Sequence, residues 1–211
     1  MTKVYLEVGK RRVFASAADW PGWTRSGKDE QSALEALAAA APRYAQVPKA
    51  ARIAFVPGKG FEVVERLPGD ATTDFGAPGA IAKAESKRLT KKEAGRLSAL
   101  VAASWTVLDR VVESSPPSLR KGPRGGGRDR DAIVEHVLGA ETMYVRKLGM
   151  RLQPPAAGDA AAAREFRNEI VAGLRAGTKG VTERGWPARY AARRIAWHVL
   201  DHAWEIEDRA T

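Results

Sequence analysis

The chain has 211 residues, enough for one or two domains with a buried core, and it contains no cysteine. The lack of cysteine excludes disulfides, cysteine-ligated zinc, iron–sulfur clusters and thiol nucleophiles, so histidine and carboxylate side chains are the remaining candidates for binding a metal. Lysine and arginine number 35 against 25 aspartate and glutamate residues, and the resulting net charge of +10 raises the alternative of a nucleic-acid-binding protein.

The N-terminal sequence from Met1 to Glu7 lacks the apolar core of a signal peptide. No stretch of the chain reaches the roughly 20 apolar residues that a membrane-spanning helix needs. We therefore expect a soluble cytoplasmic protein that does not contact a membrane.

Residues 1–64 predict a small α+β domain. Apolar and polar residues alternate from Val4 to Val8, which predicts a strand with one buried face, and the segment from Arg12 to Ser16 offers a second strand. Asp29 can cap a helix that ends at Pro42 to Tyr44.

The end of this domain is predicted as a hairpin. The segments from Arg52 to Val56 and from Gly60 to Val64 are extended in pattern, and the sequence Pro-Gly-Lys-Gly joins them as a turn. Residues 65–88 then lack sustained periodicity and are rich in proline, glycine, alanine and threonine, which predicts a linker.

The N-terminal region resembles the small HicB-like domain, an α+β module. The resemblance covers residues 3 to 45 approximately and is carried by Asp19, Pro21, Gly22, Gly27, Ala33, Leu34, Ala36 and Leu37. Nothing downstream resembles the DNA-binding module that accompanies HicB antitoxins. The resemblance therefore implies packing or partner binding, including homodimerisation through a strand edge.

Residues 89–211 predict an antiparallel four-helix bundle, so the whole chain is expected to be α+β. Thr90 and Glu93 form a capping box, and Pro187 can occupy the first turn of the last helix. The expected helices run from Thr90 to about Glu113, from Asp129 or Asp131 to about Leu148, from about Ala160 to Ala176, and from Pro187 to about Arg209.

All three histidines of the chain lie in two of these helices. His198 and His202 are four residues apart, so they lie one turn apart on the same helical face, and His136 lies on the apolar face of another helix. Three imidazoles with one or more waters form an open site for zinc, nickel or iron. The alternative is that the rings are buried histidines that only donate hydrogen bonds within a structural, dimeric bundle.

From about residue 83 onward the chain resembles the DinB-like superfamily of four-helix bundles, which includes mycothiol-dependent maleylpyruvate isomerase and related thiol-dependent enzymes. The resemblance is carried by His136 to Glu141, Tyr144, Leu148, and the segment from Arg194 to Glu205. It implies that His136, His198 and His202 bind a divalent metal. It also implies a small-molecule substrate or thiol, and the reaction would be that of a transferase, an isomerase or a metal-dependent hydrolase.

Several other residues are candidates for supporting this site. Glu205, Asp201 and Glu141 can orient an imidazole, and Tyr144 can donate a hydrogen bond at the mouth of the site. We expect Trp197 and Trp204 to pack against the N-terminal domain or the first long helix.

A basic loop offers a different interpretation. Its cations are Arg120, Lys121, Arg124, Arg128 and Arg130. They can bind an anionic cofactor or a phosphate backbone, or they can belong to a solvated connector. The alternative function is therefore a non-enzymatic regulator that binds nucleic acid or a protein partner through the basic surface and the HicB-like domain.

Overall fold

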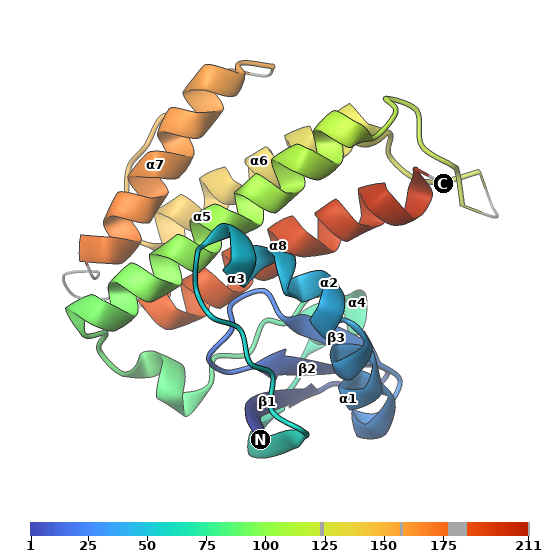
Figure 1. Ribbon diagram of the computed structural model, residues 1–211, viewed down its shortest axis with the longest axis vertical. Helices are drawn as coiled ribbons and strands as arrows, with labels where there is room; N and C mark the ends of the chain where they lie inside the picture. The colour runs from blue at the N-terminus through green and yellow to red at the C-terminus, as the bar shows by residue number, and fades with distance from the viewer. Residues whose placement is uncertain (123–124, 157, 177–184, 211) are drawn as a thin grey trace.

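The computed structural model describes residues 1–122, 125–156, 158–176 and 185–210. It is a mixed α+β structure in which a small four-stranded sheet precedes several long helices, as the sequence predicts (Figure 1).

The N-terminal sheet contains β1 (Thr2–Val8), β2 (Val13–Ala17), β3 (Thr24–Gly27) and β4 (Phe61–Pro68) in the order β3-β2-β1-β4. β1 pairs antiparallel with β2, which pairs antiparallel with β3, whereas β4 lies parallel to β1 on its other side. The helices α1 (Glu30–Ala39), α2 (Ala41–Tyr44) and α3 (Gln46–Ala50) connect β3 to the region before β4. Asp29 caps α1 through Ser32, as expected.

The predicted hairpin at residues 52–64 is wrong. Residues 52–56 form no strand, and β4 pairs with β1 instead of with the segment before it. The apolar residues of that segment have another use, because Phe55 packs edge-on against Trp20, Trp23 and Tyr44. The alternation of Ile53 and Phe55 reflects packing on this aromatic cluster rather than strand pairing.

The segment expected to be a linker contains regular structure. β4 continues to Pro68, and it is followed by α4 (Ala71–Phe75) and a 3-10 helix, η1 (Lys83–Ser86). Two buried carboxylates fix this segment. Glu7 accepts hydrogen bonds from Thr73 and from the backbone of Gly79 and Ala80, and Glu85 pairs with Arg193. Periodicity cannot reveal order that depends on such long-range pairs.

The four long helices begin and end close to the predicted positions. They are α5 (Lys91–Ser114), α6 (Arg130–Lys147), α7 (Ala160–Ala176) and α8 (Ala188–Arg209). The capping box of Thr90 and Glu93 is present at the start of α5, and Pro187 immediately precedes α8. α5 packs against α7 and α8, and α6 packs against α8.

Helix α8 is buried on most of its surface and lies between the N-terminal sheet and the other long helices (Figure 1). Trp197 meets Phe14 of β2 edge-on, with ring centroids 6.0 Å apart. Gly22, which has a φ of +90°, lies so close to Ala196 and Leu200 that there is no room for a side chain. The N-terminal unit thereby fixes the face of α8 that is opposite to the face carrying the histidines.

Candidate metal centre

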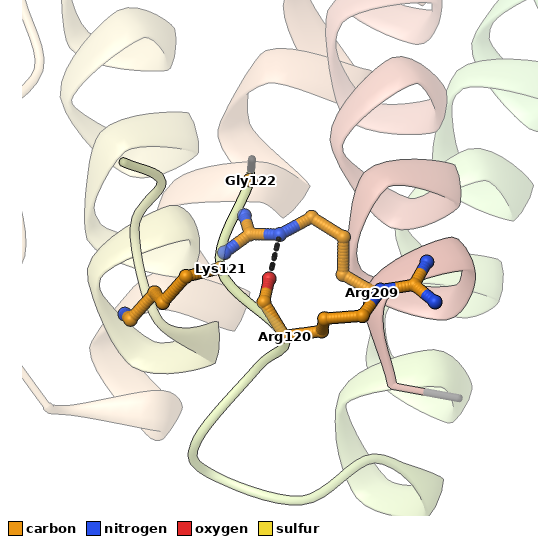
Figure 2. A pocket seen from close by; sticks show the side chains of 4 residues that line it. All are labelled: Arg120, Lys121, Gly122 and Arg209. Atoms are coloured by element: carbon orange, nitrogen blue, oxygen red, sulfur yellow. Dashed lines mark hydrogen bonds between the residues drawn. The ribbon is translucent and has the colours of Figure 1, made fainter. Parts of the chain in front are cut away.

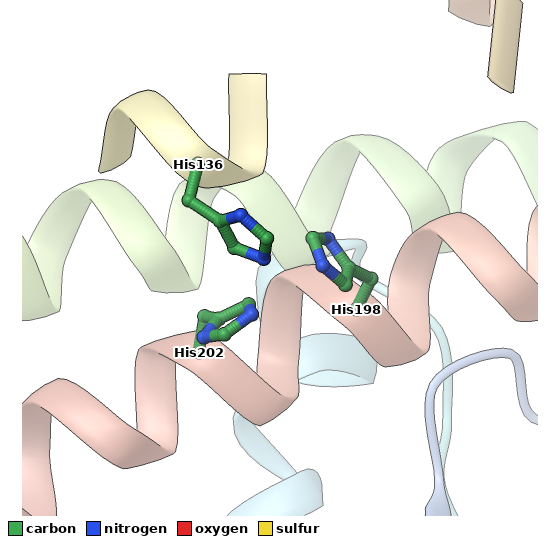
Figure 3. A group of neighbouring side chains, drawn as sticks. All are labelled: His136, His198 and His202. Carbon is green, nitrogen blue, oxygen red and sulfur yellow. The ribbon is translucent and has the colours of Figure 1, made fainter. Parts of the chain in front are cut away.

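The structure brings the three histidines together, as the sequence predicts. α8 presents His198 and His202 on one face, and α6 places His136 opposite them (Figure 3). The centroid of the His136 ring lies 5.2 Å from that of His198 and 4.8 Å from that of His202. The centroids of the His198 and His202 rings are 4.7 Å apart. One potential ligand atom from each residue lies within 4.8 Å of the other two. The three residues are therefore close enough to hold a metal ion.

Burial lowers the pKa of two of these rings. His198 is 7% exposed, and burial, together with the neighbouring His202 and His136, lowers its pKa to about 2. The pKa of His136 is lowered as well, first by burial and then by the charge of His202. A neutral imidazole has a free lone pair, which is the state that binds a metal.

The donor set fits a divalent metal. Within the described part of the chain the Nδ1 atom of His198 is buried without a hydrogen-bond partner, so the protein leaves this polar atom unsatisfied. A tetrahedral zinc ion with bonds of about 2.0–2.1 Å holds its nitrogen ligands about 3.4 Å apart. The potential ligand atoms of the three histidines lie within 4.8 Å of one another, which is near that spacing.

Glu205 supports the cluster as expected. Its Oε2 atom lies 2.8 Å from Nδ1 of His202, and its Oε1 atom accepts a 2.6 Å hydrogen bond from Arg209. These contacts hold the pKa of Glu205 below its usual value, with the hydrogen bond to His202 as the main cause. The bond at Nδ1 leaves Nε2 of His202 as the atom available to a metal, the usual arrangement of a carboxylate behind a metal-binding histidine.

The expectations for Glu141 and Asp201 are wrong. Glu141 accepts hydrogen bonds from Trp105 and Arg167 in a buried cluster between α5, α6 and α7, and none of its described hydrogen bonds reaches a histidine. Asp201 pairs with Arg25 of β3 at 3.3 Å. Both carboxylates satisfy cations from distant parts of the chain, which helical spacing alone could not show.

Aromatic side chains pack around the histidine cluster and along α8. The Tyr144 ring meets the His198 ring edge-on, with ring centroids 5.8 Å apart. Its centroid lies 5.1 Å from that of the tilted Trp186 ring. None of the described hydrogen bonds of Tyr144 reaches a histidine. The Cζ atoms of Arg25 and Arg43 each lie over the ring of Trp204, at 5.0 and 5.3 Å from its centroid. Together with the contact of Trp197 to Phe14, this confirms that Trp197 and Trp204 pack against the N-terminal region.

The basic loop is attached to the end of α8. Arg209 donates from Nε to the carbonyl of Arg120 at 2.9 Å (Figure 2). It also donates from Nη2 to the carbonyl of Arg128 at 2.7 Å. A pocket of about 380 Å³ lies here, lined by Arg120, Lys121, Gly122 and Arg209. Lys121 pairs with Asp129, and Arg130 pairs with Asp131. Arg124 lies outside the described residues.

Sequence reasoning missed Arg209, which joins Glu205 to the basic loop. The signal was available, because Glu205 and Arg209 are four residues apart on one helix and such pairs interact. It also missed the role of Arg167, whose partners Glu141 and Asp109 lie on two other helices. No local pattern could have identified that role.

No protein-family model matches the chain, and neither curated proteins nor solved structures show a significant similarity to it. The helices in the described part of the chain include none that is long and apolar enough to cross a membrane.

Proposed function

We propose that the protein binds one divalent metal through His136, His198 and His202. The observation that carries this proposal is the convergence of the three ligand atoms within 4.8 Å of one another. It is supported by the lowered pKa of His198 and His136, by the unsatisfied Nδ1 of His198, and by the carboxylate of Glu205 behind His202.

Zinc is the metal that the donor set favours, with nickel and iron as the alternatives, because all three accept imidazole ligands. Three protein ligands leave a coordination position for a small molecule, and a metal there supplies Lewis-acid chemistry. The chain's own residues hold the geometry. Glu205 orients His202, while Tyr144 and Trp197 cover His198 with apolar surface.

The finer proposal is an enzyme of the DinB-like four-helix type with an N-terminal HicB-like unit. Its reaction would be a thiol-dependent transfer or isomerisation, or a metal-dependent hydrolysis. A thiol used in such a reaction would come from outside the chain, which contains no cysteine. His198 is buried whereas His136 and His202 are partly exposed, so the site has a low-dielectric side and a side open to a small molecule.

Metal analysis of the full chain, purified without a histidine tag, tests the metal site. We expect about one zinc per chain and an increase in stability of about 4 kcal/mol when free zinc exceeds Kd 1,000-fold. His198→Ala should abolish stoichiometric binding. Val199→Ala is the matched control, since Val199 is buried on the same helix and should lose packing energy but keep the metal.

Circular dichroism of each variant separates loss of the metal from loss of the fold. A folded wild-type chain that takes up no zinc, nickel or iron would refute the proposal. Equal metal binding by wild type and His198→Ala would also refute it.

A further inference from the structure

Two rows of side chains line the contact between α6 and α8. On α8, Arg194, His198 and His202 follow one another at intervals of four residues, so each lies about 6 Å along the helix from the next. On α6, His136 and Tyr144 lie eight residues apart on one face. The helices run in opposite directions here, because His136 meets His202 while Tyr144 meets both His198 and Arg194.

The guanidinium group of Arg194 is held in a fixed position at the end of these rows. Its Cζ atom lies 4.7 Å from the ring centre of Trp197 and 5.8 Å from that of Tyr144. Its Nη1 atom donates to the carbonyl of Pro78 at 3.2 Å. A planar cation stacked on two aromatic rings has little freedom, and it presents its remaining N–H groups in a defined direction.

Arg194 differs from the arginines beside it, because no described residue serves as its counter-ion. Arg189 pairs with Glu93, and Arg193 pairs with Glu85. Among the described residues no carboxylate lies within ion-pair distance of Arg194, although its side chain is partly buried. A partly buried guanidinium group that has no carboxylate partner among these residues keeps its capacity to pair with an anion from outside.

The position of Arg194 relative to the histidines indicates where such an anion would lie. Arg194 is one helical turn from His198 on α8. On the facing helix α6, Ala140 lies between His136 and Tyr144 and has a small side chain. Lys121 and Arg130 of the basic loop differ from Arg194 in this respect, because each of them pairs with a carboxylate.

We infer that Arg194 binds the anionic group of a small molecule whose other end occupies the metal centre. The substrate class is therefore a compound with a metal-binding atom and, about one helical turn away, a carboxylate or phosphate group. This inference rests on the proposed metal site and deepens it, since it names the charge that the ligand carries. Arg194 acts as a binding residue and takes no part in the bond changes.

Cobalt-loaded protein and a matched pair of thiols test the inference. The probes are 3-mercaptopropionate and its neutral analogue 3-mercaptopropionamide, and the band from cobalt to sulfur in the near ultraviolet reports binding of each. We expect wild type to bind the acid roughly tenfold or more tightly than the amide, because a hydrogen bond to a charged group has about that value. Arg194→Gln should bind both probes with equal, weak affinity.

Two further variants control the experiment. Arg146→Gln removes an exposed charge from the same region of α6 and should leave the preference for the acid unchanged. Arg194→Lys keeps the charge but loses the planar group, so an intermediate preference is expected. Cobalt stoichiometry and circular dichroism verify that each variant is folded and loaded. Equal affinity of wild type for acid and amide, or an unchanged preference in Arg194→Gln, overturns the inference.

Failure of the metal site would be visible separately, as the absence of bound cobalt. Calorimetric titration of propionate and inorganic phosphate into the metal-free protein then decides the role of Arg194 and distinguishes the two anions. Binding that is lost in Arg194→Gln but kept in Arg146→Gln supports the inference. No binding by wild type, or equal binding by wild type and Arg194→Gln, overturns it.

Discussion

Nδ1 of His202 lies 2.8 Å from Oε2 of Glu205, which is three residues further along α8. The same carboxylate is held from its other side by Arg209. This chain of contacts fixes the ring orientation of His202 before any ligand arrives, and it links the histidine cluster to the loop that Arg209 anchors.

Weakening this contact should weaken metal binding without unfolding the chain. We expect Glu205→Gln to reduce the affinity for zinc about 10-fold or more, because partners behind a metal-binding histidine typically have effects of 10–100-fold. Competition with a chromogenic chelator measures the affinity. Glu207→Gln removes a charge from the same end of α8, where Glu207 contacts Arg43, and should leave the affinity unchanged. Equal affinities of wild type and Glu205→Gln would contradict this role of Glu205.

Position 22 should not accept any residue larger than glycine. Its φ of +90° disfavours other residues, and a Cβ atom would lie 2.6 Å from Cδ1 of Leu200. We expect Gly22→Ala to lower the free energy of unfolding by about 1–3 kcal/mol, measured by urea denaturation. Gly95→Ala in α5 is the control, because nothing lies within 4 Å of its added Cβ atom and the change should stabilise the helix by about 0.5–1 kcal/mol. The prediction fails if both variants are equally stable.

Replacing only one partner of the buried pair Glu85 and Arg193 should destabilise the protein more than replacing both partners together. Their side chains are 4% and 5% exposed, and Nε of Arg193 lies 2.6 Å from Oε1 of Glu85. We expect Arg193→Met to cost about 3–5 kcal/mol, because it leaves Glu85 charged and buried, whereas the double change Glu85→Met with Arg193→Met should cost less. Denaturant midpoints of wild type, Glu85→Met, Arg193→Met and the double variant test this. A double variant that loses as much stability as the sum of both single variants would contradict it.

The ion pair between Glu93 and Arg189 predicts a dependence of stability on pH. Hydrogen bonds from Arg189 and from Thr90 lower the pKa of Glu93 from 4.5 to about 2. A lowered pKa in the folded state means that the unfolded chain binds the proton more readily. The stabilisation is therefore fully present above pH 4.5 and disappears as the pH falls to about 2.

Glu93→Gln should accordingly be less stable than wild type at pH 7 and equal to it near pH 2. Urea denaturation at several pH values follows the difference between the two proteins. Glu169→Gln, which changes an exposed carboxylate on α7, should differ little from wild type at every pH. A difference for Glu93→Gln that is the same at pH 7 and pH 2 would argue against the ion pair.

The bounds of the long helices could be predicted because their signals are local. Thr90 and Glu93 specify the start of α5 within a single turn, and Pro187 fits the position just before α8. The fourth strand could not be paired correctly from the sequence. Its partner β1 lies more than fifty residues earlier, and the apolar alternation around Phe55 serves an aromatic cluster instead.

The site divides in the same way. The pairing of His198 with His202, and the contact of Glu205 with His202, follow from spacing within one helix. His136 reaches His202 because the apolar faces of α6 and α8 pack together, and the apolar pattern of these two helices indicated this packing. The partners of Glu141 and Asp201 come from α7 and β3, and only the packing of the whole chain determines them.

The burial of most of the surface of α8 has a consequence for metal selectivity. Its outer face is fixed by Trp197 against β2 and by the Gly22 turn, while its inner face carries His198 and His202 toward α6. The helix therefore cannot shift to suit the radius of an incoming ion, and only the rings can adjust by rotation. The site should therefore bind ions that accept a few nitrogen ligands in a compact geometry. It should bind ions that require six oxygen ligands only weakly, because its ligands are imidazoles and its helices are held in place.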